Sequence, residues 1–190
     1  TVTHLLKSIL EMADKKVGLI GTDVIMIGER EIPAERTTPE SYQLQYYFRT
    51  MLDAGMEYCV MEVSSHALEL KRVYGTQFQV GIFTNLTHDH LDFHGTMDRY
   101  ARAKSILFSN CKKGVGNADD AYNDTITAQV NPHVNYSIEQ ESDLKASNIR
   151  LSERGSVFQV SGVMQGQIKV GLPGRFNVYN ALAAALGALE

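Results

Sequence analysis

Two short apolar runs, each followed at once by a polar cluster, constrain the fold more than any other feature. The run 58–61 reads Tyr-Cys-Val-Met and leads into Glu62, and the run 80–83 reads Val-Gly-Ile-Phe and leads into a loop with three histidines. Runs that are apolar throughout are typical of buried strands in a parallel sheet. Because ligands of open α/β sheets bind at the carboxyl ends of strands, the two clusters are expected to share one site. This arrangement suggests a metal-assisted enzyme.

The rest of the chain predicts an α/β fold with a doubly wound, mostly parallel sheet. Strands are expected at 16–21, 58–63 and 79–86, and helices between them; one of these is predicted to begin with a threonine cap at Thr37-Thr38, ahead of Pro39. The pattern then changes to short segments with β propensity, separated by glycine turns, which predict a small antiparallel appendage. These segments are 133–138, 146–151, 156–161 and 167–170, and a final helix is expected over 180–190.

Composition excludes several classes of function. The 190 residues carry a net charge of -4, which gives no basic surface for nucleic acid. No segment approaches the ~18 consecutive apolar residues that a membrane span needs. The two cysteines, Cys59 and Cys111, make a weak case for a disulfide, so a reducing cytoplasm is expected.

Glu62 is a candidate metal ligand. A carboxylate at the end of an apolar strand is costly unless it has a partner, and Mg²⁺ takes oxygen ligands. Alternatively, the amides of Val63 and Ser64 bond this carboxylate, or Lys71 or Arg72 pairs with it.

The histidine loop allows two interpretations. His88, His90 and His94 lie close together in the sequence, which is compatible with a zinc site, but their spacing is not that of a helical pair of ligands and no cysteine is near. A single histidine that contacts a metal already held by oxygens is favoured. Asp89 could instead orient the loop through backbone hydrogen bonds.

Lys104 interrupts the apolar face of the helix expected from Thr96 to Phe108. Such a lysine either extends to solvent or works in a site with an altered pKa. Burial lowers the pKa of a lysine, and the neutral amine can add CO₂ to give a carbamate, an anionic metal ligand.

Other polar residues have simpler explanations. Asn117-Ala-Asp-Asp120 alone is a turn, and Asn177 and Asn180 could cap a helix. Lys71, Arg72 and Arg175 could bind phosphate or lie on the solvated surface.

In the order of the chain, these motifs match one family: the sequence resembles the central, ATP-binding domain of the Mur ligases, and within it the members that form the muramyl tripeptide. The matching stretches are Met61-Glu-Val-Ser-Ser-His-Ala-Leu68, Arg72-Val73, Thr84-Asn-Leu with Asp89-His-Leu-Asp-Phe-His-Gly95, Tyr100 with Ala103-Lys104, Asn117-Ala-Asp-Asp120 and Gly174-Arg-Phe-Asn-Val-Tyr-Asn180. They span almost the whole chain. One position departs, because many members place a glutamine where this chain has Leu70.

The resemblance implies a role for each matching residue. Glu62 and His90 are expected to bind two Mg²⁺ ions, with Lys104 as a carbamate on the second. Contacts with a UDP-muramyl-dipeptide are implied for Thr37, Thr38, Ser64 and Arg72. Contacts around the adenine and ribose of ATP are implied for Asn117, Asn177 and Asn180.

The implied reaction is ATP-dependent amide-bond formation in peptidoglycan precursor synthesis, in the cytoplasm of a bacterium. The dipeptide carboxylate would form an acyl phosphate, which the amine of meso-diaminopimelate or L-lysine would then attack. The phosphate loop of the family would precede Thr1, and the UDP-binding and amino-acid-binding domains are expected outside residues 1–190, so these residues alone are expected to be inactive. Alternatives are a folylpolyglutamate synthase-like ligase, a metal-dependent hydrolase and a non-catalytic nucleotide-binding module.

Overall fold

The computed structural model describes residues 1–88 and 91–190. The chain divides into two compact units, one formed by Thr1 and Thr3–Thr76 and the other by Val2 and Gln77–Glu190. Within the described residues, no helix has the length and apolar character needed to cross a membrane.

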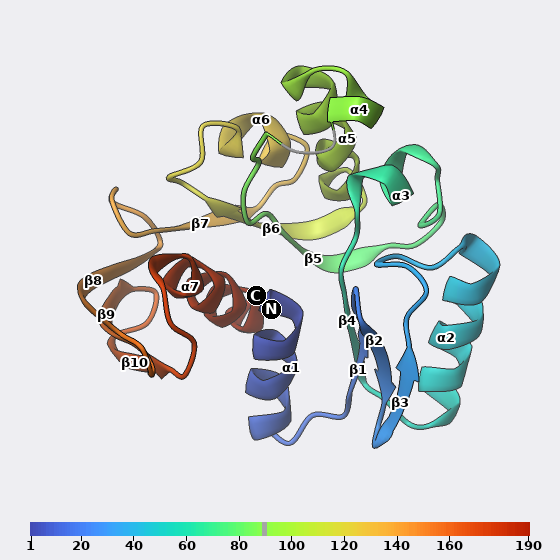
Figure 1. Ribbon diagram of the computed structural model, residues 1–190, viewed down its shortest axis with the longest axis horizontal. Coiled ribbons are helices and arrows are strands. Elements are labelled where there is room, and N and C mark those ends of the chain that lie inside the picture. The colour runs from blue at the N-terminus through green and yellow to red at the C-terminus, as the bar shows by residue number, and fades with distance from the viewer. Residues whose placement is uncertain (89–90) are drawn as a thin grey trace. The chain divides into compact units, whose positions relative to one another are not determined.

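The first unit is a small mixed sheet between two helices. The strand order is β3-β2-β1-β4, with β4 parallel to β1 and the other pairs antiparallel. Helices α1 and α2 lie on opposite faces of this sheet (Figure 1), and the short α3 follows β4. The elements are α1 (Val2–Met12), β1 (Val17–Ile20), β2 (Val24–Ile27), β3 (Arg30–Pro33), α2 (Ser41–Asp53), β4 (Tyr58–Met61) and α3 (Ser65–Glu69).

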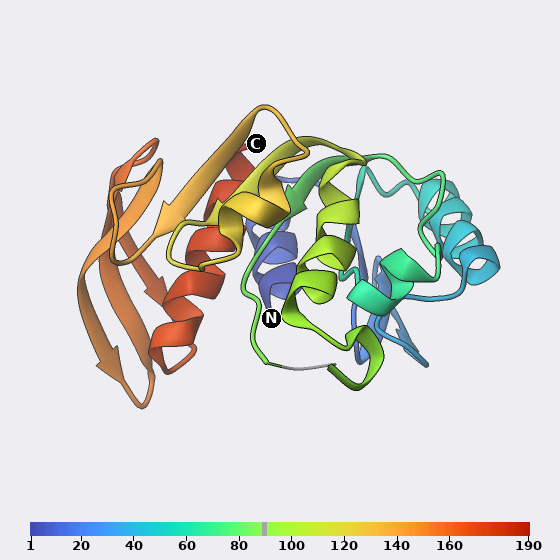
Figure 2. The ribbon, with the colours of Figure 1, turned by 90° about the horizontal axis from the view of Figure 1, so that it is seen from above.

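The second unit is a six-stranded sheet in the order β10-β9-β8-β7-β6-β5. Strands β5 to β8 are parallel to one another, and β9 and β10 continue the sheet as antiparallel strands. Helix α7 covers one face, while α5 and α6 lie on the other, as Figures 1 and 2 show. The elements are β5 (Phe78–Ile82), α4 (Leu91–His94), α5 (Met97–Phe108), β6 (Cys111–Asn117), α6 (Asn123–Thr127), β7 (His133–Ser137), β8 (Leu144–Ser152), β9 (Gly155–Gly162), β10 (Gly166–Val170) and α7 (Arg175–Leu189).

The core of the second unit explains the glycine in the run 80–83. A Cβ atom at Gly81 would lie 2.5 Å from Cys111 Sγ and 3.3 Å from the Phe108 ring, so β5 can approach these side chains only without one. Phe108 is 1 % exposed and packs with Phe83 and Ile126. This close packing holds α5 against the strand that leads into the histidine loop.

The predicted α/β class with a mostly parallel sheet and an antiparallel appendage is confirmed, although several details differ. β4 and β5 are edge strands of separate hydrogen-bonded sheets and are only partly buried, so Tyr58 and Cys59 are exposed rather than covered as their apolar run suggested. β7 pairs in parallel with both β6 and β8, so the appendage begins one strand later than predicted. α7 begins at Arg175, which places Asn177 and Asn180 inside its first turns.

The predicted threonine cap is wrong, because α2 begins at Ser41 after Glu40. The Thr38 side chain is fully buried and lies at the exit of β4 instead. Its hydroxyl donates to the Glu62 carbonyl oxygen and accepts from the Ser64 N–H, both at 3.0 Å. Backbone groups that leave a sheet lose their ladder partners, and this one hydroxyl supplies two replacements.

We expect Thr38→Val to lower the free energy of unfolding by about 1–3 kcal/mol, because the same shape without a hydroxyl leaves two backbone groups unpaired. The matched control is Thr37→Val, whose partly exposed hydroxyl lies 3.3 Å from that of Thr22 and can be replaced by water. Urea unfolding followed by circular dichroism measures both. Equal losses in the two variants would show that the buried bonds of Thr38 carry no special weight.

Candidate active site

The Glu62 carboxylate follows β4 and is held by threonines. Oε2 accepts from Thr22 Oγ1 at 2.7 Å, and Oε1 accepts from Thr3 Oγ1 at 3.2 Å. Thr22 lies between β1 and β2 and Thr3 lies in α1, so three elements supply the oxygens. Neither pairing foreseen for this carboxylate, with Lys71 or with Arg72, forms. The result is a partly exposed cluster of hard oxygen atoms at the end of a parallel strand.

Arg72 lies beside Thr38 and is held by an ion pair and a hydrogen bond. Its guanidinium lies 3.0 Å from Glu40 Oε1 and donates to the Thr38 carbonyl oxygen at 3.3 Å. Arg36 binds the same Glu40 oxygen. The Nε atom of Arg72 is buried and has no partner within the described residues. The side chain is therefore fixed by one acid and one carbonyl, and it keeps spare donor capacity.

Ser64 completes this group. Its hydroxyl accepts from the Ala67 N–H at 3.2 Å and so caps α3, while its own N–H is bound by Thr38. The four residues predicted to contact the UDP-linked substrate, Thr37, Thr38, Ser64 and Arg72, therefore belong to one hydrogen-bonded region around Glu62.

In the second unit, Lys104 lies on α5 beside an aromatic pair. Its Nζ is 5.2 Å from the centre of the Tyr100 ring, and His94 stacks on that ring at 4.7 Å. Burial lowers the pKa of Lys104, and the Asp120 carboxylate only partly counteracts this effect. The side chain is half-buried, as expected for a lysine on an apolar face. The lowered pKa increases the fraction of neutral amine at a given pH.

The histidines of the loop do not share one environment. His88 is exposed, whereas His94 is 2 % exposed and packs between the rings of Phe93 and Tyr100. The predictions for Asp89 and His90 lie outside the described residues. Over residues 1–88 and 91–190, no group of three or more His, Cys, Asp or Glu side chains is placed to hold a metal.

Asn117 and Asp120 brace the loop that follows β5. The Asn117 amide donates to the Thr84 carbonyl oxygen at 2.8 Å, and its own oxygen accepts from the Asp119 N–H at 3.1 Å. Asp120 accepts from the Leu86 N–H at 2.9 Å. The turn interpretation of this segment is confirmed. A contact between Asn117 and a nucleotide stays a prediction.

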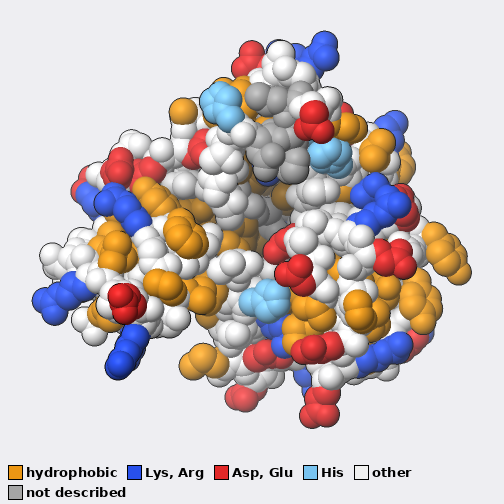
Figure 3. Space-filling view, viewed as in Figure 1, with side chains coloured by type: hydrophobic (Ala, Val, Ile, Leu, Met, Phe, Trp, Pro, Cys, Tyr) orange, Lys and Arg blue, Asp and Glu red, His pale blue; other side chains and the backbone are white. Residues whose placement is uncertain are grey.

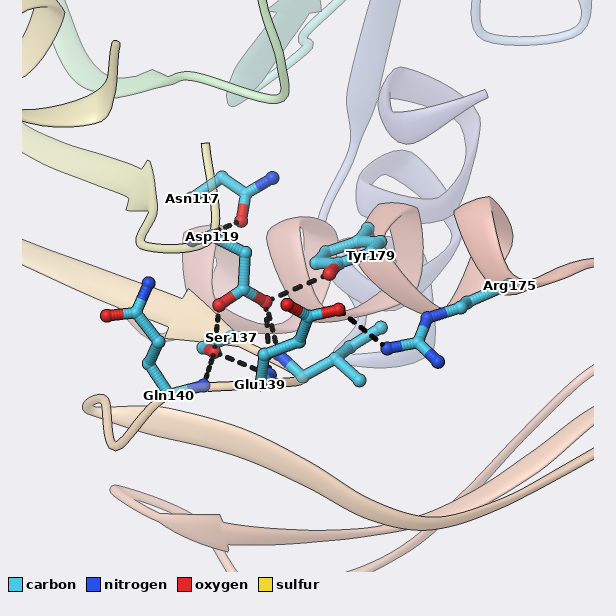
Figure 4. Close-up of polar contacts among 8 residues, drawn as sticks. Asn117, Asp119, Ser137, Glu139, Gln140, Arg175 and Tyr179 are labelled. Carbon is cyan, nitrogen blue, oxygen red and sulfur yellow. Dashed lines mark hydrogen bonds and ion pairs between the residues drawn. The ribbon is translucent and has the colours of Figure 1, made fainter. Parts of the chain in front are cut away.

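Asp119 is a functional candidate that sequence reasoning missed. Its carboxylate accepts from the Ser137 hydroxyl at 2.6 Å, from the Ile138 and Glu139 N–H groups at 2.8 and 3.2 Å, and from the Tyr179 hydroxyl at 2.9 Å (Figure 4). Partial burial works to raise the pKa of this carboxyl, but the four hydrogen bonds outweigh it and hold the pKa below its usual value. Burial and the bond to Asp119 raise the pKa of Tyr179 to about 12.

The two asparagines of α7 form a short chain of hydrogen bonds. Asn177 is 5 % exposed and donates to the Pro173 carbonyl oxygen at 2.7 Å, and Asn180 donates to Asn177 Oδ1 at 3.0 Å. Gly174 precedes the helix with φ 97°, a conformation that favours glycine. The capping alternative for Asn177 and Asn180 is therefore wrong, because Asn177 donates to a carbonyl oxygen and no side chain of the described residues accepts a hydrogen bond from the free N–H groups at the start of α7.

The predicted site residues lie in separate local groups. Glu62 lies in the first unit and Lys104 in the second, and His90 is outside the described residues, so their convergence on metal ions stays a prediction. Polar residues that received no role from the sequence complete each group. These are Thr3, Thr22, Glu40, Asp119, Ser137 and Tyr179.

Charge on the surface is mixed. On the face shown in Figure 3, acidic and basic side chains are interspersed over both units. An anionic substrate would therefore be met by local donors such as Arg72 rather than by a broad basic field.

Comparison with known proteins gives the family. A family model described as the Mur ligase middle domain matches residues 1–188. UDP-N-acetylmuramoyl-L-alanyl-D-glutamate–2,6-diaminopimelate ligases of Clostridium acetobutylicum and Clostridium tetani are 46% and 49% identical over 192 and 194 residues. Each alignment covers 100% of this chain and 40% of the relative, so the chain spans about two-fifths of the length of these proteins.

Solved structures agree. A UDP-N-acetylmuramoyl-L-alanyl-D-glutamate–2,6-diaminopimelate ligase superposes with a TM-score of 0.90 at 31% identity, over 100% of this chain and 40% of that one. The MurF enzyme of Acinetobacter baumannii, 20% identical with a TM-score of 0.73 over 99% of this chain and 39% of its own, shares the fold. Together with the strand-end residues described above, these matches show that the chain belongs to the Mur ligase family, as a middle domain.

Proposed function

We propose that this chain is the middle domain of an ATP-dependent ligase that adds 2,6-diaminopimelate to UDP-N-acetylmuramoyl-L-alanyl-D-glutamate. The observation that carries the proposal is the 46–49% identity to two such ligases along the whole chain. In the reaction, a substrate carboxylate takes the γ-phosphoryl group of ATP, and the amine then displaces phosphate to leave an amide, ADP and phosphate. Its precursor substrates are water-soluble nucleotides, which fits a cytoplasmic enzyme.

The residues around Glu62 fit a magnesium ion. Mg²⁺ prefers oxygen ligands and keeps several waters, so one carboxylate with neighbouring hydroxyls suffices on the protein side. Thr22 and Thr3 hold both carboxylate oxygens in place and supply such hydroxyls. When bound, the ion neutralises charge on the transferred phosphoryl group. Glu62 and His90 are the proposed ligands.

Lys104 is proposed to act as a carbamate. Its lowered pKa makes the neutral amine available, and that amine combines with CO₂ to give a carbamate and a proton. The product is an anion in a position where the unmodified side chain is a cation. As an anion with oxygen atoms, the carbamate would help to hold a second magnesium ion, whereas the unmodified ammonium group cannot bind a cation.

Arg72 and its neighbours are proposed to hold the UDP-linked substrate. A guanidinium offers five donors in a fixed fork, which suits carboxylate and phosphate groups. Thr37, Thr38 and Ser64 lie in the same region. Asn177 and Asn180 at the start of α7 and Asn117 at the end of β6 are the proposed contacts around the adenine and ribose of ATP.

The test uses the full-length ligase with ATP, Mg²⁺ and the UDP-linked dipeptide. Phosphate release is expected only when diaminopimelate is added, with a tripeptide product of matching mass; L-lysine is the comparison substrate. Glu62→Gln should reduce the rate at least about 100-fold, because it removes a charged metal ligand. Phosphate release that depends on neither the dipeptide nor the amino acid would refute the proposed function.

Replacing Lys104 with methionine is expected to stabilise the fold at neutral pH. Burial disfavours the ammonium form in the folded state, so part of the folding free energy is lost below the ordinary lysine pKa of 10.5 and recovered as the pH rises towards it. The stability gap between Lys104→Met and the parent should therefore narrow from pH 7 to pH 10 in urea unfolding. Arg102→Met, an exposed cation of α5 that stays charged, should show no such narrowing.

The carbamate at Lys104 can be detected directly by its carbon resonance. Full-length protein incubated with ¹³C-bicarbonate and Mg²⁺ should show a carbamate carbon resonance that is missing in Lys104→Met, and that variant should lose at least about 100-fold in rate. Identical spectra for the two proteins would remove the proposed modification while leaving the ligase assignment untouched.

A further inference from the structure

Apolar packing sets which face α7 turns towards the sheet. Val178, Leu182 and Leu186 recur every four residues and are each 0 % exposed. Ala181, Ala183 and Ala184 are buried as well, and their small methyl groups tolerate a small rotation of the helix about its axis. Polar contacts at the start of α7 therefore still adjust the rotation of its first turns.

One polar contact is well placed to do this. The Tyr179 hydroxyl donates to the Asp119 carboxylate at 2.9 Å (Figure 4). Asp119 is itself held by the Ser137 hydroxyl and the Ile138 N–H, so it is fixed to the exits of both β6 and β7. The other tie in this region, between Arg175 and Glu139, joins two exposed side chains, and such ion pairs contribute little.

We propose that Asp119 and Tyr179 are positioning residues for nucleotide binding, an inference that rests on the function proposed above. Tyr179 stands between Asn177 and Asn180 in the sequence, and all three lie in the first turns of α7. Asn180 is bonded to Asn177, and Asn177 to the backbone before the helix. A rotation of α7 would move both asparagines together, and the Tyr179–Asp119 bond opposes that rotation.

Asp119 does not contact the nucleotide under this proposal. Three of its four hydrogen bonds fall on Oδ2 and the fourth, from Ser137, falls on Oδ1, so the carboxylate is held by the exit of β7 and by Tyr179. Its effect on the nucleotide must pass through Tyr179 and the helix. This separates a positioning residue from a binding residue in an experiment.

The experiment measures steady-state kinetics of the full-length ligase with Tyr179→Phe. The KM for ATP should rise about five- to tenfold, which corresponds to the net contribution of about one ordinary hydrogen bond, while kcat and the KM values of the other two substrates change less than about twofold. Asp119→Asn, which keeps the size of the side chain, should also raise the KM for ATP.

A double-mutant cycle tests whether the effect passes through the asparagines. In an Asn180→Ala background, Tyr179→Phe should no longer change the KM for ATP, because the group that it positions is gone. The control is Leu186→Val, a fully buried residue in the second half of α7, which should lower the melting temperature without changing the KM for ATP.

Each outcome points to one conclusion. An unchanged KM for ATP in Tyr179→Phe overturns the inference, and so does an equal rise in the Asn180→Ala background or in Leu186→Val, since these would indicate general destabilisation. If the parent enzyme forms the tripeptide normally, the proposed function stands in all these cases. If the parent forms no tripeptide, the proposed function itself has failed.

Discussion

Loops that leave the carboxyl ends of parallel strands carry backbone groups that the sheet no longer pairs, and the structure depends on how these groups are satisfied. Here side chains from neighbouring segments supply the missing hydrogen bonds. Thr38 binds two backbone groups after β4, Asn117 and Asp120 bind two in the loop after β5, and Asp119 binds two after β7. A buried backbone group without a partner costs free energy, so the identity of these few side chains determines the shape of the site.

Each unit has a carboxylate that follows a strand, and the hydrogen-bond donors to that carboxylate differ between the two units. Around Glu62 the hydrogen-bond donors are the hydroxyls of Thr3 and Thr22, which can exchange one contact for another by a small rotation and so leave the carboxylate available to a ligand. Around Asp119 the partners include two fixed backbone N–H groups, which both donate to Oδ2. The first carboxylate is suited to binding and the second to holding structure, although both are acids at the end of a strand.

Much of the fold followed from the sequence, because apolar runs and helical spacing report local structure directly. The location of Lys104 on α5 and the turn at Asn117 also followed from spacing. The burial of β4 did not, because an apolar run does not show whether a strand is central or at an edge. Tyr179 and Asp119 lie 60 residues apart, and no local pattern links them. Thr38 looked like a cap because a threonine before proline usually is one, but a distant backbone segment offered its hydroxyl better partners.

The sharing of Asp119 among two loops and one helix couples their motions. If a ligand at the start of α7 steadies the Tyr179 hydroxyl on Asp119, the same carboxylate is held more firmly against the Ile138 and Glu139 amides. Thermodynamic linkage makes the effect reciprocal, so that tightening the turn after β7 favours the ligand to the same degree. The rate of hydrogen exchange at these two amides would then depend on whether a ligand occupies a site that neither of them touches. The Asp119 carboxylate would both hold the turn and transmit the effect of the ligand to it.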